Sequence, residues 1–308
     1  MAAGASMTIP VSFQFAKPDP LLKNHIMALW FITCDLPLLS DYQRSDGFYL
    51  QFFLSGSGQM TYGCGRSDTL FPVTLMSAAS AAAKYELNGP AIVVGCSFTA
   101  LGWAALSSAD ASFYADRLSD ASTIFGADIL DVHARLKTMA ERGADADSMA
   151  GVLQDYLHSK MRPVHRRHEE IIRAVQDWLE AGFSPHLDEL YEALPLSRRQ
   201  AIRVVKRFFG VPPQILVRRI RASRTAALLM SSAQKREDLR ALTGQFYDQA
   251  HMIHEIRHFT GRTPGCLDQL EPGLFRASLD TEMFKSIGID LDDLAARSMK
   301  GSDGHEKA

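Results

Sequence analysis

One stretch near the C-terminus, residues 246–264, limits what this chain can fold into more than any other. After a short turn, apolar side chains recur at helical spacing, and we expect them to be buried together: Met252, Ile253, Ile256 and Phe259. The opposite face carries hydrogen-bonding side chains: Gln249, His251, His254 and Arg257. Gly261 stops the helix, and Pro264 follows shortly after it. A short helix with one apolar stripe and one polar face is typical of the second helix of a helix-turn-helix.

A similar arrangement occurs earlier in the chain. An amphipathic helix is expected over residues 166–181, and a short apolar stripe follows at 187–194. Ser197 is a good N-cap for the next helix, which should span residues 198–209 and stop at Gly210. Its basic side chains should lie outside and four apolar ones inside: Ala201, Val204, Val205 and Phe208. This pattern predicts a first helix-turn-helix.

A connecting helix, residues 214–231, separates the two motifs, and residues 238–243 would open the second. The connecting helix is about 27 Å long at 1.5 Å per residue. Adjacent major-groove entries on one face of DNA lie about 34 Å apart. Two weak motifs at a consistent spacing therefore predict a paired arrangement.

The charge of the chain is unevenly distributed. Residues 160–265 hold 19 Lys and Arg against 11 Asp and Glu, a balance of +8. The preceding segment, 1–159, holds 9 Lys and Arg against 15 Asp and Glu, a balance of −6. Residues 266–308 hold 5 Lys and Arg against 9 Asp and Glu, a balance of −4, so the whole chain has a net charge of −2. A basic module between two acidic segments indicates a nucleic-acid-binding domain joined to another domain.

The cysteines are widely separated and form no CxxC pair: Cys34, Cys64, Cys96 and Cys266. This spacing argues against a zinc site and against a disulfide framework. No run of about 18 apolar residues and no basic, apolar leader is present, so we expect a cytoplasmic protein without a membrane segment.

The N-terminal half favours short strands from residue 21 to about 99, after an irregular start over residues 1–20. Asn88-Gly89-Pro90 is a strong turn signal. Repeated short strands predict a small barrel or sandwich. Helices are expected over 101–106, 124–141 and 148–161, and the apolar stripes of the last two either pack on the strands or form a dimer interface.

The stretch from about 166 to 267 resembles the DNA-binding domain of AraC/XylS-type bacterial transcription regulators. The resemblance rests on Leu194–Gln200, Phe209–Pro213, Phe246–Ile253 and Phe259–Pro264. It implies a multidomain α+β chain: residues 1–160 a cupin-like effector-sensing or dimerisation domain and 161–270 an all-α double helix-turn-helix domain. Beyond the resemblance, the residues of the segment 271–308 predict a C-terminal amphipathic helix over 283–296 and a polar tail. The sequence departs from the family pattern at Pro195, Gln245, His254 and Ile256.

The function that this resemblance implies is transcription regulation without enzymatic activity. The partners would be double-stranded promoter or operator DNA, a small-molecule effector or a second copy of the chain, and RNA polymerase if the protein is an activator. The resemblance assigns base reading to Arg199, Arg203, Gln200, Ala250, His251 and His254. Phosphate contacts are expected from the remaining polar side chains of the two helices: Arg198, Lys206, Arg207, Gln249 and Arg257. Arginine can bond a guanine edge bidentately, whereas alanine can only touch a thymine methyl. The alternative is that these side chains form solvated helix faces.

Aromatic and polar side chains in the N-terminal half suggest an effector pocket: Trp30, Arg44, Tyr49, Phe52 and Trp103. Most such aromatics belong to a core. No metal or other cofactor is expected, because His251, His254 and His258 lack a carboxylate or cysteine partner in the pattern and His25 is the only histidine in the first 99 residues. Two other functions stay open: a DNA-repair-type enzyme, which would need a nucleophile such as Cys34, Cys64 or Cys96, and an architectural DNA binder without an effector.

Overall fold

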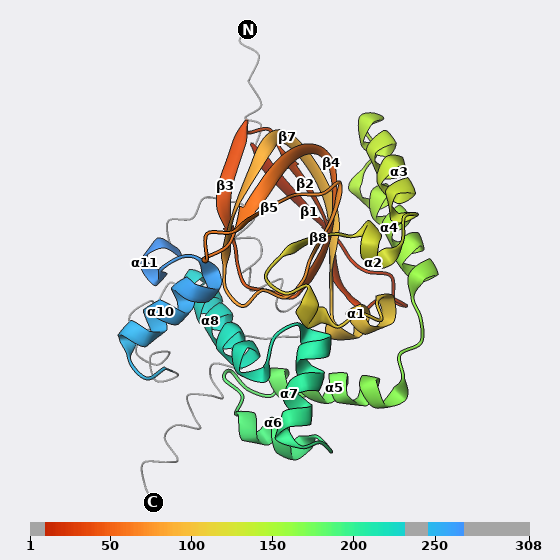
Figure 1. Cartoon of the computed structure of the whole chain (residues 1–308). Helices are drawn as coiled ribbons and strands as arrows, with labels where there is room; N and C mark the ends of the chain where they lie inside the picture. Colours follow the sequence, from red (N-terminus) through yellow and green to blue (C-terminus); the bar gives the residue numbers. More distant parts are fainter. Residues whose placement is uncertain (1–9, 232–245, 268–308) are drawn as a thin grey trace, which may run out of the picture.

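The computed structural model describes residues 10–231 and 246–267, in which one antiparallel sheet is followed by a run of helices (Figure 1). The strands in the described residues are β1 (Val11–Ala16), β2 (Ile26–Cys34), β3 (Leu38–Gln43), β4 (Phe48–Thr61), β5 (Ser67–Thr69), β6 (Val73–Met76), β7 (Ala83–Phe98) and β8 (Leu118–Asp120). They follow the order β1-β2-β7-β4-β6-β8, with β3 also paired to β7 and β5 to β4. Strand β1 lies within the segment expected to be irregular, so that expectation is wrong for residues 11–16, which pair with β2.

The long strand β7 organises the sheet. Its first part, residues 83–88, pairs with β3, and its second part, residues 91–98, pairs with β2 on the same edge. The turn expected at Asn88-Gly89-Pro90 is therefore wrong, because the strand continues through it. The three residues instead mark the point at which β7 changes its neighbour. The sheet that contains this strand is strongly curved (Figure 1).

The main core lies between one face of the sheet and the helices that follow it. Burial alternates along β4, where Phe48, Leu50 and Phe52 are buried, as expected for a strand with one covered face. Phe48 stacks on Trp103 of α1 (Ala100–Leu106), with ring centroids 5.0 Å apart. Next come η1 (Ala111–Phe113), α2 (Ser122–Phe125), α3 (Ile129–Glu141) and α4 (Ala146–Lys160). We call residues 10–160 the sheet domain.

The helix expected over 124–141 is two helices, because Gly126 ends α2 with a φ of 102° and α3 begins three residues later. Leu136 of α3 and Leu153 of α4 are fully buried in the same core as Leu50 and Phe52. These stripes thus pack on the chain's own sheet, so their buried side chains do not form a face for a second copy.

The helical module comprises α5 (Arg166–Glu180), α6 (Leu187–Ala193), α7 (Arg198–Phe209), α8 (Pro213–Ser231), α10 (Gln249–Thr260) and α11 (Pro264–Leu267). It lies below and beside the sheet domain in Figure 1. The expected boundary near residue 160 falls between α4 and α5. The helices expected at 238–243 and 283–296, and the whole segment 271–308, lie outside the described residues. No helix in the described part of the chain is long and apolar enough to cross a membrane.

Candidate nucleic-acid interface

The segment of the first predicted motif contains α6 and α7. Helix α7 begins after Ser197, whose hydroxyl accepts the backbone N–H of Gln200 at 3.4 Å, and ends at Gly210 with a φ of 78°. The predicted bounds of this helix are confirmed. Its buried residues, which include Ala201 and Val205, pack in one core with side chains of α5, α6 and α8. This packing fixes the rotation of α7 about its axis, so the opposite face is presented to solvent.

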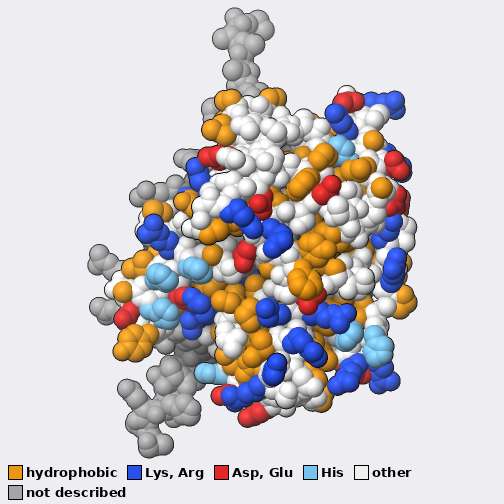
Figure 2. All heavy atoms as spheres, viewed as in Figure 1, with side chains coloured by type: hydrophobic (Ala, Val, Ile, Leu, Met, Phe, Trp, Pro, Cys, Tyr) orange, Lys and Arg blue, Asp and Glu red, His pale blue; other side chains and the backbone are white. Residues whose placement is uncertain are grey.

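Basic side chains line that exposed face. Arg199, Arg203 and Lys206 follow one another at intervals of four and three residues and are all exposed, which places them on one side of the helix. Arg198 is also exposed, with its Nη2 atom 2.7 Å from Asp188 Oδ1. Figure 2 shows Lys and Arg side chains gathered over the part of the molecule that holds α5, α6 and α7. The face has the charge that phosphates attract.

The two other predicted contacts on α7 are placed differently. Gln200 accepts the backbone N–H of Ser197 through its Oε1 atom at 3.0 Å, so its amide oxygen completes the N-terminal cap. Its amide nitrogen is the part left for a base. The guanidinium of Arg207 is exposed and lies 5.4 Å from the centre of the Phe208 ring. Gln200 therefore has a structural role that its place among the exposed residues did not reveal.

Helix α10 ends at Gly261, as predicted, and Asp248 caps its start by accepting the backbone N–H of His251 at 2.7 Å. Four predicted contact residues are exposed and His251 is half-buried; the exposed ones are Gln249, Ala250, His254 and Arg257. The expectation that Ile253 is buried is wrong, since 37% of it is exposed. The buried residues between Met252 and Phe259 are Ile256 and the charged Glu255.

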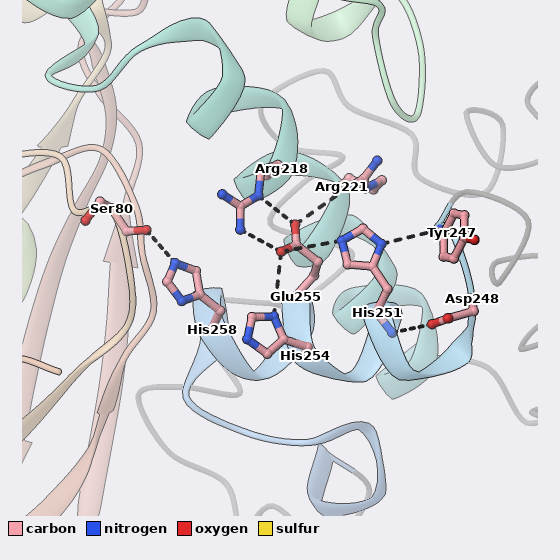
Figure 3. Close-up of polar contacts among 9 residues, drawn as sticks. All are labelled: Ser80, Arg218, Arg221, Tyr247, Asp248, His251, His254, Glu255 and His258. Atoms are coloured by element: carbon pink, nitrogen blue, oxygen red, sulfur yellow. Dashed lines mark hydrogen bonds and ion pairs between the residues drawn. The ribbon is translucent and has the colours of Figure 1, made fainter.

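Glu255 is the centre of a polar cluster between α8 and α10 (Figure 3). Its carboxylate accepts from Arg218 at 2.7 and 3.0 Å and lies 3.6 Å from Arg221. His251 and His254 approach it to 3.8 and 4.0 Å. Burial favours the neutral acid, but the hydrogen bonds and charge of Arg218, together with the charges of His251 and Arg221, lower the pKa of Glu255. The cluster joins α10 to the connecting helix.

The helical phase could have revealed Glu255 in the sequence, because it lies three residues after Met252 and four before Phe259. Its arginine partners lie 37 and 34 residues earlier and carry no local signal. The polar face of α10 was predicted correctly, whereas the polar residue on its buried face was missed.

Both α7 and α10 rest on the sheet domain at their C-terminal ends. A Cβ atom on Gly210 would lie 2.7 Å from Ala78 Cβ, and one on Gly261 would lie 2.4 Å from the Tyr42 ring. The last carbonyls of α10 are also bonded there, since Ser45 N–H donates to the carbonyl of Phe259 at 2.7 Å. The N-terminal halves of the two helices carry Arg199, Arg203, Ala250 and His254, all of which are exposed. A helix-turn-helix contacts bases with this N-terminal part.

His258 makes two further contacts of the same kind. Its carbonyl accepts the backbone N–H of Ala82 at 2.8 Å, and its ring Nε2 lies 3.1 Å from the carbonyl of Ser80 (Figure 3). A helix leaves its last carbonyls without partners inside the helix. The sheet domain supplies those partners for α10 and thereby orients it.

The substitution Gly261→Ala is expected to lower the free energy of unfolding by at least about 1–2 kcal/mol, because residue 261 has a φ of 78° and no space for a Cβ atom beside Tyr42. Gly265→Ala is the control, since a Cβ atom there meets nothing within 4 Å. Urea unfolding of the full chain would measure both. Equal losses from the two variants would contradict a specific contact at Gly261.

A second contact joins the sheet domain to α8. The Asp46 carboxylate accepts from the Tyr49 hydroxyl and lies 2.6 Å from Arg44 Nη2, while its backbone carbonyl accepts from Arg219 Nη1 of α8 at 2.7 Å. Burial raises the pKa of Asp46, but the charges of Arg44 and Arg219 together hold it below its ordinary value. Two of the predicted effector residues, Arg44 and Tyr49, thus lie where the sheet domain meets the helical module.

The other predicted effector residues lie elsewhere. Phe52 and Trp103 are fully buried in the main core, and Trp30 packs with Ile32 and Val93 in a separate cluster. The structure also contains a groove of ≈ 560 Å³ between β4 and α3. None of the five predicted effector residues lines it; its lining includes Phe53, Leu54, Leu70, Phe71, His133 and Lys137.

The residues on which an enzymatic alternative would depend are dispersed. Cys34 and Cys96 are fully buried in different clusters, and Cys64 is exposed. Burial raises the pKa of the Cys96 thiol, which disfavours the nucleophilic thiolate. Within residues 10–231 and 246–267, no group of three or more His, Cys, Asp and Glu residues is arranged to hold a metal ion.

Comparison with known proteins gave structural likenesses only. No family model matches the chain, and no curated protein does. An apo form of ToxT from Vibrio cholerae aligns at 10% identity over 83% of this chain and 94% of that chain, with a TM-score of 0.43. A second ToxT structure from Vibrio cholerae aligns at 11% identity over 77% of this chain and 99% of that chain, with a TM-score of 0.41. An unsaturated fatty acid-bound ToxT from Vibrio cholerae aligns at 12% identity over 77% of this chain and 96% of that chain, with a TM-score of 0.39. Since these TM-scores are below 0.5, the likenesses establish neither a family nor a function for the chain.

Proposed function

We propose that this protein binds double-stranded DNA sequence-specifically and regulates transcription. The observation that carries the proposal is the row of exposed basic side chains on α7, Arg199, Arg203 and Lys206, on a helix whose other face is fixed by packing. Such a helix, preceded by α6 and a short turn, has the form that enters a major groove. The exposed histidine and arginine of α10, His254 and Arg257, supply a second polar face.

We assign the exposed residues by their chemistry and by their place along each helix. Arg199 and Arg203 read bases, because a guanidinium can bond two atoms of a guanine edge. Gln200, Ala250, His251 and His254 complete the base-facing set. Arg198, Lys206, Arg207, Gln249 and Arg257 hold phosphates, which orient the protein on the duplex without reading sequence.

The contacts between the sheet domain and the helical module support regulation of DNA binding. The sheet domain contacts α7 at Gly210, α8 at Arg219 and α10 at Gly261. An effector that displaced Arg44 or Tyr49 from Asp46 would alter the support of α8, and through it the spacing of α7 and α10. A small molecule or a second copy of the chain could act at this junction, and an activator would in addition contact RNA polymerase.

The experiment that tests DNA binding is selection from a random duplex library with the full chain, followed by affinity measurements on the recovered site. Four cations are assigned to phosphates, so the logarithm of the binding constant should fall with the logarithm of salt concentration with a slope of about −3.6. Arg135→Ala is the control and should leave affinity unchanged, because Arg135 is an exposed residue of α3 in the sheet domain. Binding without a recovered consensus would indicate an architectural binder, and absent or salt-insensitive binding would refute the proposal.

A further inference from the structure

We infer that α10 reads thymine methyl groups through Ile253, beside Ala250, whereas α7 reads guanine through its arginines. This inference rests on the proposed function and specifies which bases the preferred DNA site contains. The preferred site would carry thymines in the segment facing α10 and guanines in the segment facing α7. The two segments would lie about one helical turn apart, roughly 34 Å.

The position of Ile253 on α10 carries the inference. Ala250, Ile253 and Arg257 are separated by three and four residues, so they share one side of the helix, and all are exposed. The buried side of the helix is fixed by Met252 and Ile256, which are at most 1% exposed, and Ile253 lies at its border. Since Ile253 is 37% exposed, its apolar side chain faces outward next to the basic Arg257.

The charges around α10 also support contact between its outward side and DNA. The carboxylate that precedes α10 and the one within it both have partners in the protein: Asp248 caps the helix, and Glu255 pairs with Arg218 and Arg221. His254 approaches Glu255 to 4.0 Å and stacks on His258 with ring centroids 6.2 Å apart. The outward side therefore combines a phosphate-binding cation with the apolar surface of Ile253 and Ala250, while α7 presents guanidinium groups.

DNA offers one apolar group in its major groove, the C5 methyl of thymine. An isoleucine that faces water gains free energy when it packs on such a methyl, because apolar surface leaves water on both sides. The same side chain offers no donor or acceptor to the other base edges. A thymine facing Ile253 is thus the base that this position favours.

Replacement of thymine by uracil in the selected site tests the inference, because it removes the methyl and leaves base pairing intact. In the α10 segment, each methyl lost from contact with Ile253 should weaken binding of the full chain roughly fourfold, the factor for one buried methyl group. The same replacement in the α7 segment should have little effect. The α7 segment is identified as the one where Arg199→Ala relaxes base preference.

The variant Ile253→Ala completes a double-mutant cycle. It should bind thymine-containing DNA several-fold more weakly than the unmodified chain and should no longer distinguish thymine from uracil. Leu130→Ala on α3 is the matched control, since Leu130 is an apolar side chain of similar exposure, 42%, in the sheet domain. Circular dichroism and thermal unfolding would confirm that both variants are folded.

Three outcomes separate the hypotheses. Loss of thymine–uracil discrimination in Ile253→Ala alone would support the inference. Equal affinity of the unmodified chain for thymine and uracil sites, or unchanged discrimination in Ile253→Ala, would overturn it while leaving sequence-specific DNA binding in place. Failure to bind any DNA would overturn the proposed function itself, and the inference with it.

Discussion

Replacing Glu255 by alanine is expected to lower the free energy of unfolding by about 3 kcal/mol, because it removes the buried partner of two arginines. The Glu255 side chain is 1% exposed, whereas the side chains of Arg218 and Arg221 are 39% and 16% exposed. Partial hydration of the arginines reduces the loss to the lower end of the range for broken buried ion pairs. The measurement is urea unfolding of the full chain at neutral pH.

The control for this variant is Glu170→Ala on α5. Glu170 also pairs with an arginine, Arg166, at 2.8 Å, but both side chains are largely exposed. An exposed pair contributes at most about 1 kcal/mol, so its loss should be small. Similar losses from Glu255→Ala and Glu170→Ala would contradict the structural role of the buried cluster.

The pH dependence gives the Glu255 cluster a second test. Because the pKa of Glu255 is lowered by folding, its contribution to stability is fully present above the ordinary value of 4.5 and is lost as the pH falls through the folded value below it. Glu255→Gln cannot ionise and should lack this part of the acid dependence. The difference in unfolding free energy between the unmodified chain and Glu255→Gln should therefore shrink below pH 4.5. A constant difference would refute the assignment.

The substitution Arg199→Ala is expected to remove about 1–3 kcal/mol of discrimination at one base pair, roughly 5- to 150-fold in relative affinity. Arg199 lies near the N-terminus of α7, is exposed, and is carried by a helix whose rotation is fixed by its buried face. Removing the guanidinium removes its two bonds to a guanine edge. Competition among duplexes that differ at single base pairs would measure the change.

Arg207→Ala is the matched control for Arg199→Ala, because it removes a guanidinium from an exposed position at the other end of α7. It should lower affinity for all sequences alike and reduce the salt slope by about 1. Uniform losses from both variants would show that Arg199 contacts phosphate, and a base-specific loss from Arg207→Ala would reverse the two assignments.

The local features of the helical module could be predicted from the sequence. The predicted ends of α7 at Ser197 and Gly210, and the predicted end of α10 at Gly261, are confirmed. These signals act within one helical turn, since a cap bonds backbone groups two or three residues away and glycine adopts a positive φ by itself. The periodicity of the apolar residues then determined which face of α7 is exposed.

Several expectations failed where a distant segment decided the outcome. Asn88-Gly89-Pro90 has the composition of a turn, yet it lies within β7 because β3 and β2 pair on either side of it. Ile253 fits the apolar spacing of α10 but is exposed, while Glu255 is buried by its partners Arg218 and Arg221 on α8. The residue pattern around a position does not show which distant residue will contact it in the folded chain.

The sequence by itself determined the capped helices, the basic face that holds Arg199, and the division into a strand-rich half and a helical half. Only the tertiary structure decided how these parts meet: Ser45 bonds the last turn of α10, Asp46 binds Arg219, and Glu255 joins α8 to α10. The physical reason is the range of the interactions. Capping and helical periodicity act over a few residues, whereas a buried charge or an unpaired carbonyl must be satisfied by whichever distant group the fold brings to it.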